Sequence, residues 1–342
     1  MGKQTMRFMS DNTATACPQM LAALAAANHG FEMAYGDDPW TQRLDQALGS
    51  FFGAPVRAFA VATGTAANAL ALATLSPPYG AIFAHHEAHI ACDECGAPAF
   101  YTGGAQLALL PGEHAKLTSS TLAAALDAHP VSVHTVQPAA VSISQATELG
   151  TAYRPEELAR LTKVAHAHGL KVHMDGARFA NAVTFLGCHP VDVTWRAGID
   201  VLSFGATKNG ALAAEAVVFF DASLVADFEL RRKRAGHLIS KSRFVAAQLL
   251  AYLEDDLWRR NAAHANRCAQ HIGLAAGSRL LAPVEANEVF VQLGVEGKRV
   301  LRAAGFEFYD WGAESAGMAR LVAAWDQDEA HVEALCKALE AL

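Results

Sequence analysis

The sequence predicts an α/β fold, with a mostly parallel, doubly wound sheet in a large domain over residues 1–244 and a smaller α+β C-terminal domain over residues 245–342. Short apolar runs alternate with helical segments as far as about Phe244, a pattern typical of parallel strands covered by helices on both faces. Beyond that point long helical stretches precede short strands, which indicates a different architecture. A chain of 342 residues is longer than one usual domain and too short for three.

The composition favours a large core and buried subunit contacts, since 52% of the residues are apolar and 18% are charged. A net charge of −7 argues against a nucleic-acid partner, which would call for a basic stripe. We expect no membrane span and no secretory peptide, because no apolar run is long enough and residues 1–9 lack an apolar signal core. Six cysteines do not suggest a disulfide framework in a chain of this size, so a cytoplasmic location is the simpler prediction.

The expected elements follow in chain order. The first part, to about Asp45, is rich in loops, with polar turns at residues 10–12 and 36–39. Strands are expected at residues 57–62, 81–84, 131–136, 170–174, 199–204 and 215–220, and in the small domain at 289–293, 307–309 and 320–324. Helices are expected at residues 66–75, 117–129 (capped by Thr118), 155–168 (with Pro155 in the first turn), 244–277 and 328–342.

Three polar groups fall at the ends of expected strands, where open α/β sheets bind ligands. The first is the turn Thr63-Gly64-Thr65, which precedes a helix. Its free backbone N–H groups and the positive helix end can hold a phosphate, and Thr65 adds a hydroxyl donor. The plainer alternative is a tight turn with a threonine cap, and no Gly-Lys-Ser/Thr follows as it does in a nucleotide P-loop.

Asp175 is the second group and directly follows the expected strand at 170–174. An acid at this place can be an ordinary helix cap. It can also pair with a pyridinium nitrogen and keep that ring protonated. Arg178, three residues later, is placed to bind a carboxylate through two N–H groups, with an ordinary ion pair as an alternative of equal weight.

Lys208 is the third group and lies in the small, apolar stretch 203–210 after a strand. Burying a lysine is costly unless it is used, and a desolvated amine is a nucleophile that forms Schiff bases. The alternative is a surface lysine whose ammonium reaches water. The order of the three groups, each at a strand end, favours a pyridoxal 5'-phosphate (PLP) site in which Lys208 carries the cofactor as a Schiff base.

With these groups placed, the chain resembles the PLP-dependent L-threonine aldolases of fold type I, the aspartate-aminotransferase-like fold, within the β-eliminating lyase group. It is similar to the branch called low-specificity L-threonine aldolase or phenylserine aldolase. The resemblance covers nearly the whole chain and rests on motifs at residues 10–12, 35–38, 63–68, 88–89, 93–98, 173–179 and 207–210. It implies a lyase that cleaves L-β-hydroxy-α-amino acids (L-threonine, L-allo-threonine and, as a further candidate, phenylserine) to glycine and an aldehyde.

The resemblance also implies roles for single residues. Lys208 would form the Schiff base, Asp175 would pair with the ring nitrogen, and His89 would stack on the ring and act on the substrate hydroxyl. The other expected cofactor-binding residues are Gly64, Thr65, Thr207 and Arg243, the last reaching a neighbouring subunit's phosphate. The amino-acid carboxylate would be held by Ser10, Arg178 and Arg320. A homodimer or homotetramer with active sites at the subunit interface is implied, with Tyr35 in the segment that borders a neighbour's site.

One stretch departs from the family pattern. Many threonine aldolases have a second active-site histidine after the strand expected at 131–136, whereas residues 143–148 contain none. Gln145 and Glu148 are the polar candidates there, so the group that takes the β-hydroxyl proton stays open. No metal site is expected, because the histidines and cysteines at 85–95 lack the HExxH spacing and a second CxxC pair.

Two rival functions remain open, and they differ from an aldolase in the reaction product or in the colour of the protein. Another fold-type-I PLP enzyme, a β-eliminating lyase or an aminotransferase, would act on another amino acid, and transamination would release a keto acid. A non-catalytic α/β binding protein would be colourless and would not react with borohydride.

Overall fold

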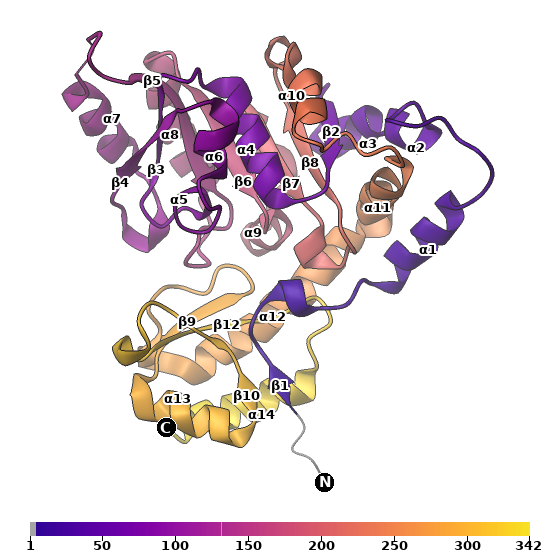
Figure 1. Cartoon of the computed structure of the whole chain (residues 1–342). Coiled ribbons are helices and arrows are strands. Elements are labelled where there is room, and N and C mark those ends of the chain that lie inside the picture. Colours follow the sequence, from indigo (N-terminus) through magenta and orange to yellow (C-terminus); the bar gives the residue numbers. More distant parts are fainter. Residues whose placement is uncertain (1–4, 131) are drawn as a thin grey trace.

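The larger part of the fold is built on a seven-stranded sheet in the order β2-β8-β7-β6-β5-β3-β4 (Figure 1). The computed structural model describes residues 5–130 and 132–342. Strand β8 is antiparallel to both of its neighbours, and the other pairs in this sheet are parallel. The strands are β2 (Arg57–Val61), β3 (Gly80–His85), β4 (Gln106–Leu110), β5 (Gln137–Ser144), β6 (Lys171–Gly176), β7 (Val201–Gly205) and β8 (Glu215–Phe219).

Helices cover both faces of this sheet, because successive strand residues point to opposite sides. Val218 belongs to the core cluster on one face, and Val217 belongs to a cluster on the other. The first face packs against α1 (Pro18–Ala27), α3 (Leu44–Phe52), α7 (Ser119–Ala128), α8 (Pro155–Ala167) and α11 (Arg243–Leu253). The second packs against α4 (Gly64–Leu75) and α10 (Phe228–Arg234), and α6 (Ala97–Thr102) lies against α4. The mostly parallel, doubly wound sheet is therefore confirmed.

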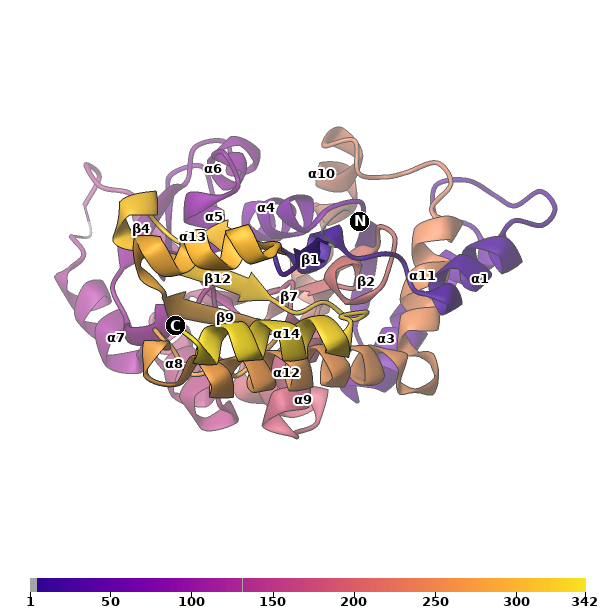
Figure 2. The same ribbon diagram turned by 90° about the horizontal axis from the view of Figure 1, so that it is seen from below.

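A smaller α+β part follows and has its own apolar core. Its strands β9 (Glu288–Gln292), β11 (Tyr309–Asp310) and β12 (Met318–Val322) form an antiparallel sheet in the order β11-β12-β9. A short parallel pair joins β1 (Met6–Arg7) to β10 (Phe306–Glu307). Its helices are α12 (Leu257–Ala276), α13 (Gly294–Ala304) and α14 (Glu329–Glu340), and α12 and α14 run side by side (Figure 2).

Helix α12 connects the two parts. Trp258, near its start, is buried in the core of the large sheet, whereas Ile272, near its end, is buried in the core of the small part. The preceding helix α11 packs entirely with the large core through residues such as Leu249. We keep the division of the chain at residues 244 and 245 as a proposal.

Several expected elements need correction. The strand expected at 131–136 is wrong: residues 132–135 form bends and turns, Val131 lies outside the described residues, and the strand is β5 (Gln137–Ser144). Val133, in the middle of that stretch, does not face a core, since it is 97% exposed. The strand expected at 307–309 is instead two short strands in different sheets. The first part of the chain also holds more helix than expected, because α1 and α2 (Pro39–Gln42) form there.

Among the described residues, no helix combines the length and the apolar character that crossing a membrane requires.

Candidate active site

A cavity of about 330 Å³ lies where β2, β6 and β7 end. Because these three strands run in the same direction, the residues that follow them meet at one edge of the sheet. The reversed strand β8 contributes its first residue, Glu215, to the same edge. The cavity is lined by seven of the predicted site residues, Gly64, Thr65, His89, Asp175, Arg178, Thr207 and Lys208.

The turn after β2 leads directly into helix α4. Thr63 caps this helix, and its side chain accepts a hydrogen bond from the N–H of Ala66. The first bond of the helical ladder runs from the N–H of Ala67 to the carbonyl of Thr63 at 3.0 Å, so the N–H groups of Gly64 and Thr65 precede that ladder. A side chain built on Gly64 would meet no atom within 4 Å, so the space beside this turn is open.

Asp175 is held in place by two donors. The side-chain nitrogen of Asn68 donates to Asp175 Oδ2 at 2.7 Å, and the N–H of Ala177 donates to Oδ1 at 3.0 Å. Burial would raise the pKa of this carboxyl group, but His89 and Lys208 outweigh burial and lower it. Asp175 is therefore an ionised carboxylate in the wall of the cavity.

His89 is oriented by a buried glutamate. Its Nδ1 lies 2.8 Å from Oε1 of Glu94. Asn68 donates to the same oxygen at 2.8 Å, so that oxygen acts as an acceptor and His89 donates its Nδ1 proton. The hydrogen bond to Glu94 raises the pKa of His89, and the charge of Asp175 adds to this effect. The imidazole therefore keeps its second proton to a higher pH than a free histidine does.

Two further glutamates line the cavity. Burial raises the pKa of Glu148 to about 7, although Ser144 and the N–H of His89 donate to its carboxylate. Burial also raises the pKa of Glu215 to about 7, against the opposing effects of Thr207 and Lys208. Both carboxyl groups can consequently exchange a proton near neutral pH, well above the range in which exposed glutamates titrate.

Arg178 forms a buried ion-pair cluster at the border of the cavity. It donates to both oxygens of Asp11, through Nε at 2.8 Å and Nη2 at 3.0 Å, and its Nη1 lies 3.3 Å from Glu288. Burial would raise the pKa of Asp11, but Arg178 and Lys208 outweigh it and lower the value to about 2. A guanidinium group has five N–H donors, so the contacts among the described residues leave two of them for a further carboxylate.

The remaining predicted residues do not line the cavity. Ser10 is buried beside it, and its hydroxyl accepts a hydrogen bond from the N–H of Asn12, which does line the cavity. Arg320 on β12 lies near Glu288, and its positive charge lowers the cost of burying the Glu288 carboxylate. The Nε of Arg320 has no hydrogen-bond partner among the described residues. Arg243, at the start of α11, stacks on Phe244 at 5.0 Å.

Gln145 and Glu148, the polar candidates in residues 143–148, differ in position, because only Glu148 lines the cavity. Gln145 is fully buried and bonds the backbone of Tyr153 through both ends of its side-chain amide, at 3.0 and 2.8 Å. Its role is therefore to shape the loop. Glu148, in contrast, lines the cavity.

Sequence reasoning missed the roles of Asn68, Glu94 and Glu215. Asn68 and Glu94 stand within motifs that the sequence analysis quoted, but nothing in a single sequence says that they contact each other. Glu215 opens an apolar strand, and a lone acid at a buried strand start is a signal that could have drawn attention to it.

Three possible metal ligands also meet in this cavity. The possible ligand atoms of His89, Glu94 and Asp175 lie within 4.8 Å of one another. Among the described residues, these three form the cluster that could hold a metal ion. The hydrogen bonds through Asn68 account for their proximity. The absence of a metal stays a prediction.

Comparisons with known proteins agree with this geometry. Residues 7–295 match the family model described as β-eliminating lyase. A low specificity L-threonine aldolase from a Pseudomonas species is 44% identical, over 100% of this chain and 99% of that protein. The structure of a threonine aldolase from Leishmania major superposes with a TM-score of 0.92 at 26% identity, covering 98% of this chain and 99% of that one.

The fold is shared more widely. An aspartate aminotransferase from Rhodobacter sphaeroides aligns over 100% of this chain and 93% of its own, with a TM-score of 0.70 at 16% identity. At that identity the likeness shows the fold alone, and it confirms the expected aspartate-aminotransferase-like architecture. With a family model that matches most of its length and a full-length relative at 44% identity, this chain belongs to the β-eliminating lyase family.

Proposed function

We propose that this chain is a PLP-dependent lyase that cleaves L-β-hydroxy-α-amino acids, L-threonine, L-allo-threonine and phenylserine among them, to glycine and an aldehyde. The observation that carries the proposal is the single cavity that joins Lys208, Asp175, His89 and the turn at Gly64. The full-length likeness to proteins named low specificity L-threonine aldolase supports it.

The cavity fits pyridoxal phosphate in its size and in its donor groups. Beside Gly64 there is open space where an anion could lie against the N–H groups that begin helix α4. Asp175 supplies a fixed carboxylate for a ring nitrogen, and Lys208 supplies an amine for a covalent link. Thr65 and Thr207 add hydroxyl groups at the same edge.

The chain's own residues perform the remaining tasks. When bound, PLP supplies an electron sink that stabilises negative charge on the substrate α-carbon. Asp175, kept ionised, would hold a proton on the ring nitrogen. Arg178, with Ser10 and Arg320 nearby, would bind the substrate carboxylate and thereby decide which bond to the α-carbon is oriented for cleavage. His89 would donate a hydrogen bond near the β-hydroxyl group.

The purified protein tests this proposal directly. It should be yellow, and borohydride should bleach it and leave the cofactor on Lys208, as peptide mass spectrometry would show. L-Threonine, L-allo-threonine and phenylserine should each yield glycine and an aldehyde. Lys208→Ala should lower kcat by more than about 1,000-fold, whereas Lys163→Ala, on the exposed side of α8, should not change it. A keto acid product, or a colourless and unreactive protein, would overturn the proposal.

We also propose a homodimer or homotetramer with active sites at the subunit interface, in the cytoplasm. Support comes from large apolar side chains that are exposed in the single chain, Phe31, Met33, Tyr35 and Leu230. Sedimentation equilibrium that yields a monomer at micromolar concentration would contradict the assembly, and cell fractionation would test the location.

A further inference from the structure

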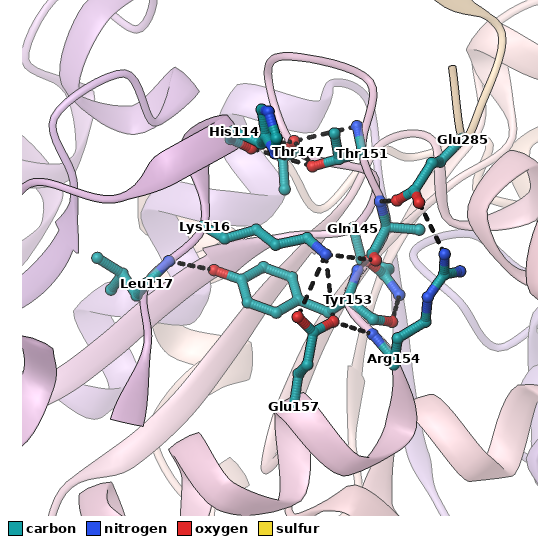
Figure 3. A network of polar contacts seen from close by, with 11 residues as sticks. His114, Lys116, Leu117, Gln145, Thr147, Thr151, Tyr153, Arg154, Glu157 and Glu285 are labelled. Carbon is teal, nitrogen blue, oxygen red and sulfur yellow. Dashed lines mark hydrogen bonds and ion pairs between the residues drawn. The ribbon is translucent and has the colours of Figure 1, made fainter. Parts of the chain in front are cut away.

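The loop between β5 and α8 carries Glu148 and is fixed by a network of polar contacts (Figure 3). At its two ends, the amide of Gln145 bonds the backbone of Tyr153 twice. The hydroxyl group of Tyr153 in turn accepts a hydrogen bond from the N–H of Leu117 at 2.6 Å. These buried bonds tie the loop to the neighbouring segment of the large domain.

Further contacts hold the middle of the loop. The hydroxyl groups of Thr147 and Thr151 both donate to the carbonyl of His114, at 3.1 and 3.0 Å (Figure 3). Glu285, from the small part of the fold, accepts from the N–H of Ala152 at 2.8 Å. Lys116 donates to the carbonyl of Ala152 at 2.8 Å. The residue that follows Thr147 is therefore presented to the cavity by a loop that is anchored on both sides.

The carboxylate of Glu148 is oriented by two donors on one oxygen. Its Oε1 accepts from the hydroxyl of Ser144 at 2.5 Å and from the N–H of His89 at 2.9 Å. No other described residue is bonded to Oε2, and Glu148 is only half-buried, so the second oxygen is available to a molecule in the cavity. The contact with the backbone of His89 places this carboxylate next to the residue expected to lie near the substrate hydroxyl.

His89 itself is poorly suited to accept a proton. Its Nδ1 proton is committed to Glu94, and the same pairing favours the form of the ring in which both nitrogens carry protons. In that form the imidazole is only a donor. A separate acceptor is needed for the β-hydroxyl proton, and the stretch in which many family members have a second histidine offers Glu148.

We propose that Glu148 accepts the proton of the substrate β-hydroxyl group, in place of a second histidine, while His89 acts as a donor; this inference rests on the proposed function. The O–H bond breaks and the proton moves to a carboxylate oxygen of Glu148. The oxygen's electron pair forms the C=O bond of the aldehyde as the Cα–Cβ bond breaks. The bonding pair stays on the α-carbon, which then takes up a proton to give glycine, and Glu148 returns its proton to solvent.

The electrostatics of the cavity agree with this role. Burial raises the pKa of Glu148 to about 7, so the group can take up and release a proton near neutral pH. The charged and titratable groups that face it across the cavity are His89, Asp175, Arg178, Lys208 and Glu215. Glu215 is the competing candidate for the proton acceptor, because its pKa is also raised to about 7. Its carboxylate, however, accepts a hydrogen bond from Thr207 and interacts with the charge of Lys208.

The test compares cleavage with a reaction that needs no β-hydroxyl group. Glu148→Gln keeps an oxygen for Ser144 and His89 but cannot accept a proton. We expect it to lower kcat for L-threonine cleavage by roughly 10²–10⁴-fold. Exchange of the glycine α-proton in D₂O, followed by NMR, and the dissociation constant of glycine, read from the visible absorbance, should change by less than about threefold. Glu148→His should recover part of the cleavage activity.

Matched variants separate the alternatives. Asp93→Asn removes an exposed carboxylate outside the cavity and should change neither reaction. Ser144→Ala removes a donor to Glu148, so the acidic limb of kcat/KM should move up by about half a pH unit. Glu215→Gln should leave that limb in place. Three results would each overturn the proposal. Glu148→Gln could cleave L-threonine within threefold of wild type, or it could lose cleavage and glycine exchange equally. The third is an acidic limb of kcat/KM that moves in Glu215→Gln.

The failure of the proposed function would look different. In that case the wild-type protein itself would not release glycine from L-threonine, so the comparison between variants would have no cleavage to lose.

Discussion

The two sides of the cavity are built in different ways. On one side, the turn at Gly64 and Lys208 follow strands β2 and β7 of the same sheet, and Asp175 is the next-to-last residue of β6, so the pairing of β2, β6, β7 and β8 sets their distances. On the other side, Asn12, Arg178 and Glu148 stand on loops or at a helix start. Their positions depend on side-chain contacts, such as the bidentate pair of Arg178 with Asp11.

This difference separates two kinds of task. In the proposed function, the strand-end side would hold the cofactor, and the backbone hydrogen bonds of the sheet give it a rigid frame. In the proposed function, the loop side would select the substrate and the bond to be cleaved, and it can change without disturbing the sheet. Substitutions on the strand-end side should therefore slow both L-threonine cleavage and exchange of the glycine α-proton. Substitutions on the loop side should slow one of these reactions more than the other.

The largest effect is expected at Asp175. Asp175→Asn keeps the size of the side chain but removes the charge that holds a proton on the ring nitrogen. We expect kcat to fall by about 10²–10³-fold, for cleavage and for glycine α-proton exchange alike. Steady-state assays of both reactions check this, with Asp192→Asn as the control, because the Asp192 carboxylate contacts Arg196 and the N–H of His189 outside the cavity. Loss of cleavage alone would break the contrast between the two sides.

A smaller and more selective effect is expected at Arg178. Arg178→Lys keeps a positive charge but cannot contact two carboxylate oxygens in parallel. The KM for L-threonine should rise by roughly 10–100-fold, as expected for the loss of a charge-assisted hydrogen bond, with a smaller change in kcat. Initial-rate kinetics measure the split, and Arg196→Lys on the surface serves as control. An unchanged KM would mean that Asp11 and Glu288 already use this side chain completely.

Glu94 allows a prediction about pH. Because the hydrogen bond to Glu94 raises the pKa of His89, Glu94→Gln should lower it, and His89 should lose its second proton at a lower pH. Asp175, Lys208 and Glu148 also face this histidine, so the remaining shift depends on them. We expect about a tenfold loss in kcat and a basic limb of kcat/KM that moves to lower pH. A profile identical to that of Glu87→Gln, a nearby glutamate outside the cavity, would contradict this role.

The smallest effect is expected in the loop network. Tyr153→Phe leaves the buried N–H of Leu117 without its acceptor. The variant should lose about 1–2 kcal/mol of stability and lower the melting temperature by a few degrees. Differential scanning calorimetry measures this, with Tyr79→Phe on the surface as control. Cleavage should decrease more than glycine exchange, since the loop presents Glu148; equal decreases would weaken the link between the network and the substrate side.

The strand-end side could be predicted from sequence, whereas on the loop side Arg178 and Glu148 could be named as candidates but the contacts that position them could not. Gly64, Asp175 and Lys208 stand immediately after apolar runs, so their meeting follows from the rule for parallel sheets. Contacts such as Asn68 with Glu94, or Arg178 with Asp11, join residues far apart in the chain and leave no local pattern. The connection from β7 to β8 is too short for a parallel crossover, so the reversed direction of β8 was also implicit in the sequence.

One amide group links the two sides. The side-chain nitrogen of Asn68 uses its two protons for Asp175 and Glu94, at 2.7 and 2.8 Å, and Glu94 in turn holds His89. In the proposed function, the strength of the electron sink and the readiness of His89 to donate would thus be thermodynamically coupled, and neither could be tuned by evolution or by design without a response in the other. A double-mutant cycle between Asp175 and His89 should accordingly be non-additive, and replacing Asn68 should bring the cycle close to additivity.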